Sequence, residues 1–408
     1  MAVAAVIFFM WGFLTSLNDV LVPHLKSVFS LNYAGVMLVQ FTFFGAYFVM
    51  SLPSGEIVSR LGYKHSIVAG LVVAAAGALL FYPAAAMPSY RVFLAAFFTL
   101  ASGITLLQVA ANPYVSLLGP ERTAASRLNL AQALNSLGTT LAPKVGGLLI
   151  LSSAVLTAGQ LVRLPAAEQV AYRARQAALV QGPYLGLAFV LFALSAGVYL
   201  FHLPAVAPHA DRRPEEAAGS FAAALAHRHL RLGVLAIFVY VGAEVAIGSF
   251  LINYVSQPEI GGVSESRAAT FVALYWGCAM IGRFAGAGLL QRADPRRLLA
   301  LCATAAAVLV STTMLATGAV AVWTIVAVGL FNSVMFPNIF TLGVERMGPL
   351  TGKASSLLIM AIVGGAVVPL LQGVLADAIG VHHAFVLPLL CYLYVIYYGL
   401  RGSDVAIA

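Results

Sequence analysis

The most regular feature of the chain is an alternation of long apolar runs with short polar breaks. A run of about 20 apolar residues crosses a hydrocarbon core about 30 Å thick as a helix. The two-residue alternation of a membrane β-barrel is absent from the sequence. The pattern therefore predicts twelve transmembrane helices, around residues 3–25, 34–58, 66–87, 92–118, 128–153, 183–203, 231–255, 267–290, 298–317, 320–343, 354–376 and 382–400.

Composition agrees with an all-α membrane protein. Of the 408 residues, 61% are hydrophobic and 9% are charged, whereas soluble domains carry about 25% charged residues. Only helices and closed barrels satisfy every backbone hydrogen bond in lipid. We therefore expect a multi-pass membrane protein, with the lipid bilayer as its surroundings.

The net charge of +8 does not indicate a nucleic-acid partner, because the basic residues divide unequally between the two sides of the membrane. With the N-terminus in the cytoplasm, fifteen Lys and Arg residues are assigned to inner loops and ends, Arg283 among them, and six to outer loops. This bias follows the positive-inside rule. It predicts that both termini are cytoplasmic.

The two halves of the chain share motifs. The pattern P-x4-L-G-x-E-R occurs at 113–122 and 337–346, and G-x4-P-x3-G occurs at 138–147 and 364–373. A segment rich in Pro, His and charged residues between the halves is typical of a linker. We predict an N-terminal six-helix bundle at 1–203, a cytoplasmic linker at 204–229 and a C-terminal six-helix bundle at 230–408.

Three charged side chains, Asp19, Lys144 and Glu244, fall inside predicted spans. A charge at bilayer depth is costly, so such residues usually face a partner, a water-filled cavity or an ion pathway. Counted from the inner ends of their helices, the three lie roughly 24, 25 and 20 Å up. We predict that they share one layer and couple transport to a cation, with Lys144 as the charge partner of Asp19.

The fourth and fifth predicted spans carry several amide side chains, which need polar partners inside a membrane. A hydrogen bond between helices satisfies any single amide, but four within 28 residues favour a hydrated cavity for a polar substrate. The ring of Trp276 either stacks on a sugar or packs between helices. The predicted substrate-binding residues are Asn18, Gln108, Asn112, Gln132, Asn135, Asn253 and Trp276.

Five stretches connect the chain with a known family: WGFLTSLNDVLVPHLK, LQVAANPY, GPER, RLNLAQALNSLG and YVGAEVAIGSF. With them the sequence resembles the fucose:proton symporter family of the major facilitator superfamily from about residue 5 to residue 400. The resemblance implies the major facilitator fold of two six-helix bundles, Asp19 as the protonated aspartate, and Gln132 and Asn135 near the sugar cavity. Gln108 stands where fucose permeases carry a glutamate, so the two-carboxylate scheme of that family does not transfer intact.

By this resemblance the chain is a proton-coupled symporter that imports a hexose or related monosaccharide across the bacterial cell inner membrane by alternating access. The candidate substrates are fucose, glucose, galactose, mannose and N-acetylglucosamine. Sodium coupling is the main alternative, and a drug exporter is a weaker one, because the amide-rich spans favour a polar substrate. No nucleophile–base or nucleotide-binding motif occurs, and the three cysteines are isolated in apolar segments. We therefore expect no enzymatic activity, no metal and no cofactor, and a monomer.

Overall fold

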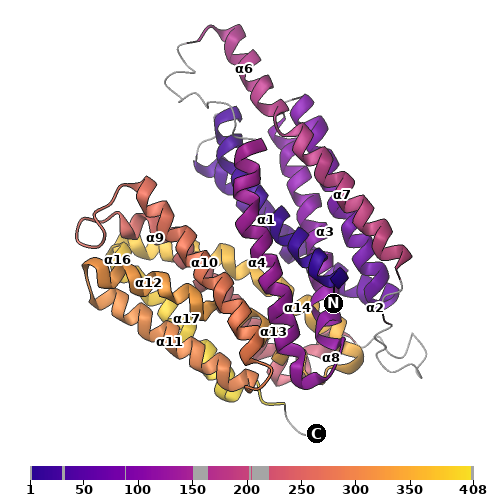
Figure 1. The fold of residues 1–408 in the computed structure, drawn as a ribbon, viewed down its shortest axis with the longest axis vertical. Helices are drawn as coiled ribbons and strands as arrows, with labels where there is room; N and C mark the ends of the chain where they lie inside the picture. Colours follow the sequence, from indigo (N-terminus) through magenta and orange to yellow (C-terminus); the bar gives the residue numbers. More distant parts are fainter. Residues whose placement is uncertain are drawn as a thin grey trace. The chain divides into compact units, whose positions relative to one another are not determined.

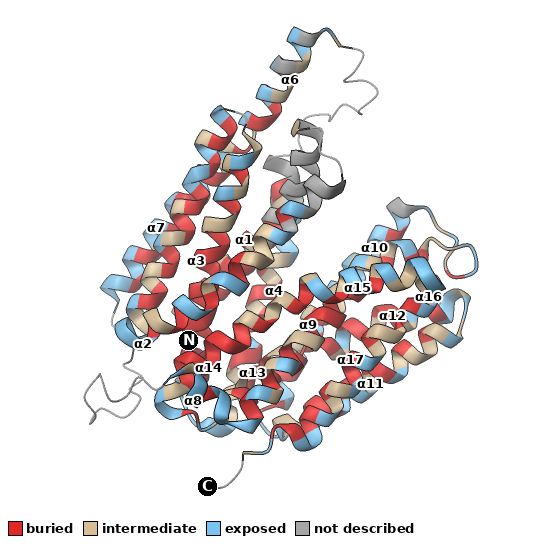
Figure 2. Ribbon diagram, turned by 180° about the vertical axis from the view of Figure 1, so that it is seen from behind, coloured by how far each residue is buried: buried red, intermediate tan, exposed pale blue. Residues whose placement is uncertain are grey.

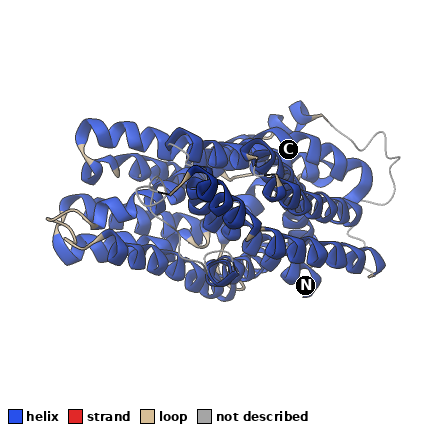
Figure 3. Cartoon of the chain, turned by 90° about the horizontal axis from the view of Figure 1, so that it is seen from above, coloured by secondary structure: helices blue, strands red, loops and turns tan. Residues whose placement is uncertain are grey.

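The computed structural model describes residues 2–29, 33–87, 89–149, 164–201, 204 and 220–405. Every regular element in these ranges is a helix (Figures 1 and 3). The α-helices are α1 (Ala2–Phe29), α2 (Tyr33–Ala86), α3 (Tyr90–Leu117), α4 (Ala124–Leu149), α6 (Ala166–Ala178), α7 (Gln181–Leu200), α8 (Phe221–Ala226), α9 (Arg228–Val255), α10 (Glu265–Leu289), α11 (Pro295–Leu315), α12 (Gly318–Asn332), α13 (Met335–Gly343), α14 (Thr351–Met360), α15 (Gly364–Ile379), α16 (Val381–Ala384) and α17 (Val386–Tyr397).

Each of the twelve predicted spans coincides with helix as far as the described residues extend. Within those residues, nine helical stretches are long and apolar enough to cross a membrane. One of the nine, Phe41–Ala86, covers most of the predicted span 34–58 and nearly all of the next. Two further predicted spans correspond to α1 and α4, which are not among the nine. The two spans within α2 meet at Gly62, whose φ of 73° and ψ of 172° interrupt the helix. Glycine adopts this backbone conformation without the steric cost that other residues meet.

Three predicted spans are each built from two helices, among them the span at 382–400, which is divided into α16 and α17. The span at 320–343 is divided into α12 and α13, and the span at 354–376 into α14 and α15, which are joined by a 3₁₀ turn, Ala361–Val363. The duplicated P-x4-L-G-x-E-R motif has the same local structure in both places. In the first copy α3 ends within the motif, and the 3₁₀ turn Glu121–Thr123 leads into α4. In the second copy α13 ends within the motif, and the 3₁₀ turn Gly348–Leu350 leads into α14. The internal repeat is therefore visible in local structure.

The chain forms two compact units. The N-terminal unit comprises residues 2–111 and 137–205, and the C-terminal unit comprises residues 112–136 and 206–408. Helices α3 and α4 thus contribute to both units. The division into bundles at 1–203 and 230–408 with a linker at 204–229 stays a prediction.

In the N-terminal unit, α2 and α3 touch through their backbones. A Cβ added at Gly77 would lie 2.6 Å from the Cα of Leu100, and one at Gly103 would lie 2.7 Å from the Cα of Ala74. Gly138 on α4 likewise lies against the backbone carbonyl of Phe9 on α1. Small residues permit this close approach in membrane bundles, where dispersion contacts drive helix association.

In the C-terminal unit, α9 packs against α10, α13, α15 and α17, and buried positions follow its length (Figure 2). Gly364 on α15 lies against the carbonyl of Phe238 on α9. Gly364 is the repeat counterpart of Gly138, so the same repeat position permits a close helix contact in both units. Gly282, in the small-residue stretch of α10, similarly lies against Leu330 and Ser333.

Large apolar side chains remain on the outside of both units. Phe189 on α7 is 74% exposed, and Leu315 on α11 is 88% exposed. Such a surface is unfavourable in water but suits a hydrocarbon environment. The exposed apolar faces therefore fit the predicted location in a bilayer.

Candidate functional site

A buried ion pair lies in the C-terminal unit. Arg283 on α10 places Nη2 3.9 Å from Oε1 of Glu244 on α9, and the two side chains are 13% and 11% exposed. Arg283 also donates a hydrogen bond through Nη1 to the hydroxyl of Ser136 on α4. Oε1 of Glu244 and Nε of Arg283 have no hydrogen-bond partner within the described chain. The pair thus retains one acceptor and one donor that no described residue uses.

The assignment of Arg283 to the inner loops was wrong. The residue lies inside the predicted span 267–290, and its guanidinium is buried against a carboxylate. The signal was available, because small and apolar residues follow it in the sequence. The partner found for Glu244 is therefore this arginine, which the sequence analysis did not place in the site.

A hydrogen-bond network supports the backbone around Glu244. Tyr275 on α10 donates to the carbonyl oxygen of Glu244 at 3.3 Å. Asn332 on α12 donates to the hydroxyl of Tyr275 at 2.7 Å and accepts from the hydroxyl of Tyr392 on α17 at 2.8 Å. Tyr240, one turn before Glu244, donates to the carbonyl oxygen of Asn332 at 2.9 Å. Four helices are thereby joined by polar contacts inside an apolar unit.

Several predicted amides are buried in the same unit. Asn112 at the end of α3 is 0% exposed, and neither amide atom has a hydrogen-bond partner among the described residues. Gln132 and Asn135 on α4 are 5% and 8% exposed and lie within the helical turn that leads to Ser136, the partner of Arg283. Gln372 on α15, not predicted, is also 0% exposed with both amide atoms unpaired in the described chain. The rule used for α3 and α4, an amide inside an apolar span, would have found it.

The structure does not bury two predicted residues of the C-terminal unit. Asn253, near the end of α9, is exposed. Trp276 on α10 is 40% exposed; its indole lies against Gly248, and its ring centroid is 5.2 Å from that of Tyr275. The Trp276 side chain is thus only partly covered by the described residues.

The N-terminal unit contains the remaining predicted residues. Gln108 on α3 is 3% exposed and donates to the hydroxyl of Tyr47 on α2 at 2.6 Å. The indole of Trp11 on α1 also hydrogen-bonds to that hydroxyl. Lys144 on α4 is exposed. The side chains of Asn18 and Asp19 lie outside the described residues, so the pairing of Asp19 with Lys144 stays a prediction.

Comparison with known proteins gives the class. The family model described as Major Facilitator Superfamily matches residues 3–362, and the chain belongs to this superfamily. The fold prediction, an all-α membrane protein with the major facilitator fold, is confirmed.

Relatives along nearly the whole chain are named as transporters. The "Glucose/galactose transporter" of Brucella abortus biovar 1 (strain 9-941) is 51% identical, covering 97% of this chain and 92% of that protein. The "L-fucose-proton symporter" of Escherichia coli (strain K12) is 35% identical, covering 98% and 92%. A crystal structure of the E. coli fucose:proton symporter matches with a TM-score of 0.91 at 33% identity, covering 99% of this chain and 98% of that chain. The predicted family resemblance is confirmed, as is the expectation of a transporter and not an enzyme.

Proposed function

We propose that this protein is a proton-coupled symporter that imports a monosaccharide across the bacterial inner membrane, with D-glucose and D-galactose as its substrates. The observation that carries the proposal is the set of buried polar groups in the C-terminal unit, namely Oε1 of Glu244, Nε of Arg283 and the amides of Asn112 and Gln372, that have no hydrogen-bond partner among the described residues. Buried polar atoms are normally hydrogen-bonded, so these groups call for water or a polyhydroxylated ligand. The named activity of the Brucella relative favours glucose and galactose.

In this proposal the sugar exchanges hydrogen bonds with the amides and with the charged pair. A sugar hydroxyl both donates and accepts, so it can donate to the carboxylate of Glu244 and accept from the guanidinium of Arg283. Asn112, Gln132 and Asn135 supply further donors and acceptors, and Trp276 supplies a stacking face. The amide of Gln108 in place of a carboxylate favours a substrate other than fucose.

Asp19 is the proposed coupling group. Protonation from the outer side neutralises Asp19 and releases Lys144, and only the carrier loaded with both proton and sugar then switches to the inward-facing state. A ligand shifts such an equilibrium only through its different affinities for the two states. Proton and sugar must therefore each favour the state that switches.

The test is uptake of labelled D-glucose, D-galactose, D-mannose, N-acetylglucosamine and L-fucose into proteoliposomes under an imposed pH gradient or sodium gradient. We expect glucose and galactose to accumulate with the pH gradient alone. Accumulation only with sodium would assign coupling to that ion. Failure to transport any sugar would refute the proposed substrate class and favour the exporter alternative.

The coupling role is tested with Asp19→Asn. This variant should still exchange internal for external sugar but should lose accumulation driven by the pH gradient. Asp377→Asn is the matched control, because Asp377 is an exposed carboxylate on α15, and it should accumulate sugar normally. Normal accumulation by Asp19→Asn would show that another group carries the proton.

A further inference from the structure

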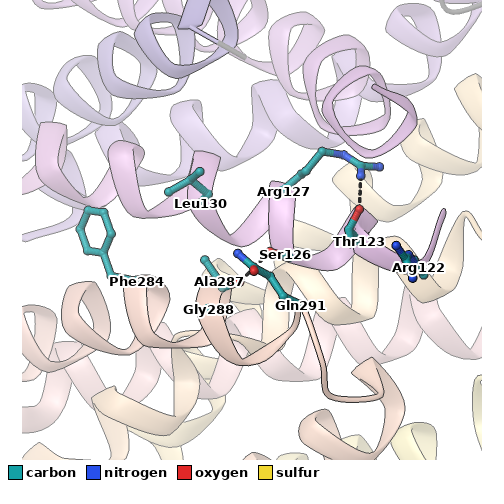
Figure 4. Close-up of a pocket in the computed structure, with 9 residues that line it drawn as sticks. All are labelled: Arg122, Thr123, Ser126, Arg127, Leu130, Phe284, Ala287, Gly288 and Gln291. Atoms are coloured by element: carbon teal, nitrogen blue, oxygen red, sulfur yellow. Dashed lines mark hydrogen bonds between the residues drawn. The ribbon is translucent and has the colours of Figure 1, made fainter. Parts of the chain in front are cut away.

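A cavity of about 600 Å³ lies between the first turns of α4 and the last turns of α10, within the C-terminal unit (Figure 4). It is separate from the Glu244–Arg283 pair, neither member of which lines it. The lining residues are Arg122, Thr123, Ser126, Arg127, Leu130, Phe284, Ala287, Gly288 and Gln291. Its volume is in the range of about 300–1,000 Å³ usual for sites that hold small molecules.

A hydrogen bond joins α4 and α10 at the wall of this cavity. Ser126 on α4 donates to the carbonyl oxygen of Ala287 on α10 at 2.6 Å. The next residue, Gly288, has no atom within 4 Å of the position that a Cβ would occupy. The absence of a side chain at Gly288 therefore keeps this part of the cavity open.

One end of the cavity is polar and positively charged (Figure 4). The guanidinium of Arg127 is fully used, because it donates to the carbonyl oxygens of 115, 116, 119 and 120 and to the hydroxyl of Thr123. Arg122 is exposed, and its guanidinium contacts no hydrogen-bond or ion-pair partner in the ranges that the structure describes. Arg122 is thus a cation available to an anionic ligand, with the exposed amide of Gln291 at the same cavity.

The other end is apolar and lies deeper in the predicted spans. Leu130 on α4 is 42% exposed, and Phe284 on α10 is 45% exposed. Phe284 precedes Gln291 by seven residues, and Leu130 follows Thr123 by seven, so the apolar end lies roughly 10 Å along the helices from the polar end. An occupant therefore needs an anionic head and a hydrocarbon part about 10 Å away.

We propose that this cavity binds one anionic phospholipid of the cytoplasmic leaflet, such as a phosphatidylglycerol. The phosphate lies at Arg122 and Gln291, and an acyl chain lies over Gly288 between Leu130 and Phe284. Guanidinium groups recognise phosphate oxygens through paired N–H donors. The charge bias of the loops places these ends of α4 and α10 on the cytoplasmic side, where anionic lipids attract basic residues.

The experiment is native mass spectrometry of the purified, delipidated full-length protein titrated with phosphatidylglycerol. Phosphatidylethanolamine, which is zwitterionic and has no net charge, is the comparison lipid, and glycerol 3-phosphate is the water-soluble head alone. The test variants are Arg122→Gln, which removes the cation, and Gly288→Leu, which adds a side chain to the cavity at a position where a Cβ has no other atom of the described chain within 4 Å beyond its own stretch of helix. The matched controls are Arg297→Gln, at an exposed arginine on α11, and Gly197→Leu, at an α7 glycine that also has open space around it.

The wild-type protein should bind the first phosphatidylglycerol more tightly than phosphatidylethanolamine. Arg122→Gln should weaken that binding roughly fivefold, the factor that corresponds to about 1 kcal/mol for one basic residue near an anionic lipid. Gly288→Leu should abolish the first binding event, and both controls should bind as wild type. Unchanged affinity in either test variant, equal affinity for the two lipids, or binding of glycerol 3-phosphate as tight as that of the lipid would overturn the proposal.

Discussion

Replacing Asn332 with leucine is expected to destabilise the C-terminal unit through the hydroxyls that this amide satisfies. The substitution removes the donor to Tyr275 and the acceptor of Tyr392, while the backbone carbonyl that accepts from Tyr240 stays in place. Tyr275 keeps its hydrogen bond to the carbonyl of Glu244. Tyr392, fully buried, is left with a hydroxyl donor and no acceptor.

The magnitude follows from these two losses. An orphaned buried donor costs about 1–3 kcal/mol, and one lost hydrogen bond costs about 0.5–1.5 kcal/mol. Asn332→Leu should therefore cost about 1.5–4.5 kcal/mol. Tyr392→Phe alone removes one hydrogen bond and should cost about 1 kcal/mol. In the double variant Asn332→Leu/Tyr392→Phe no hydroxyl of Tyr392 remains to be orphaned. Its loss of unfolding free energy should therefore be smaller than the sum of the two single losses, by at least about 1 kcal/mol.

Reversible unfolding in mixed micelles with increasing denaturing detergent, followed by tryptophan fluorescence, measures these free energies. Asn253→Leu is the control, because Asn253 is exposed, and it should change stability by less than about 0.5 kcal/mol. If the effects of Asn332→Leu and Tyr392→Phe add to within about 0.5 kcal/mol, the two side chains are not coupled and the network does not support the site.

Three further substitutions test other contacts. Gly364→Ala should cost about 1–3 kcal/mol, because its Cβ meets the backbone of α9. Gly373→Ala, whose Cβ meets one ring atom at 3.6 Å, should be nearly neutral. Equal shifts in melting temperature for the two variants would contradict the close contact at Gly364. Arg127→Lys removes the guanidinium whose hydrogen bonds to backbone carbonyls hold the loop between α3 and α4. Trypsin should then cut this loop at least several times faster. An unchanged cleavage rate would refute this role. Glu244→Gln leaves Arg283 without its carboxylate and should lower the free energy of unfolding by about 3 kcal/mol. Adding Arg283→Gln should recover part of this loss. Additive losses in the double variant would indicate that the two side chains do not interact.

Hydropathy predicted the helices well, because each span must satisfy its own backbone in lipid and therefore leaves a long apolar run. It did not predict the interruption between α12 and α13. That interruption occurs next to Asn332, whose side chain and carbonyl take part in contacts with other helices. Local sequence carries little information on such a break, because tertiary contacts stabilise it.

The candidate site was predicted less completely. The sequence identified Glu244, because a carboxylate within a membrane span is costly. It did not identify Arg283 as the partner, because the packing of α9 against α10 depends on tertiary structure. Arg283 lies near the end of its span, and a count of loop charges does not distinguish an exposed arginine from a buried one. The buried amide of Gln108 was expected from sequence, whereas its partner Tyr47 depends on how α2 and α3 pack.

The direct contact between α2 and α3 has a mechanical consequence for a carrier that alternates between two states. Where side chains separate two helices, changes of rotamer allow small relative sliding. At Gly77 and Gly103 the backbones themselves touch, so sliding produces clashes that no rotamer relieves. The second half of α2 and α3 therefore resist relative sliding, and in the proposed transport cycle we expect the displacements at helix pairs that meet through side chains.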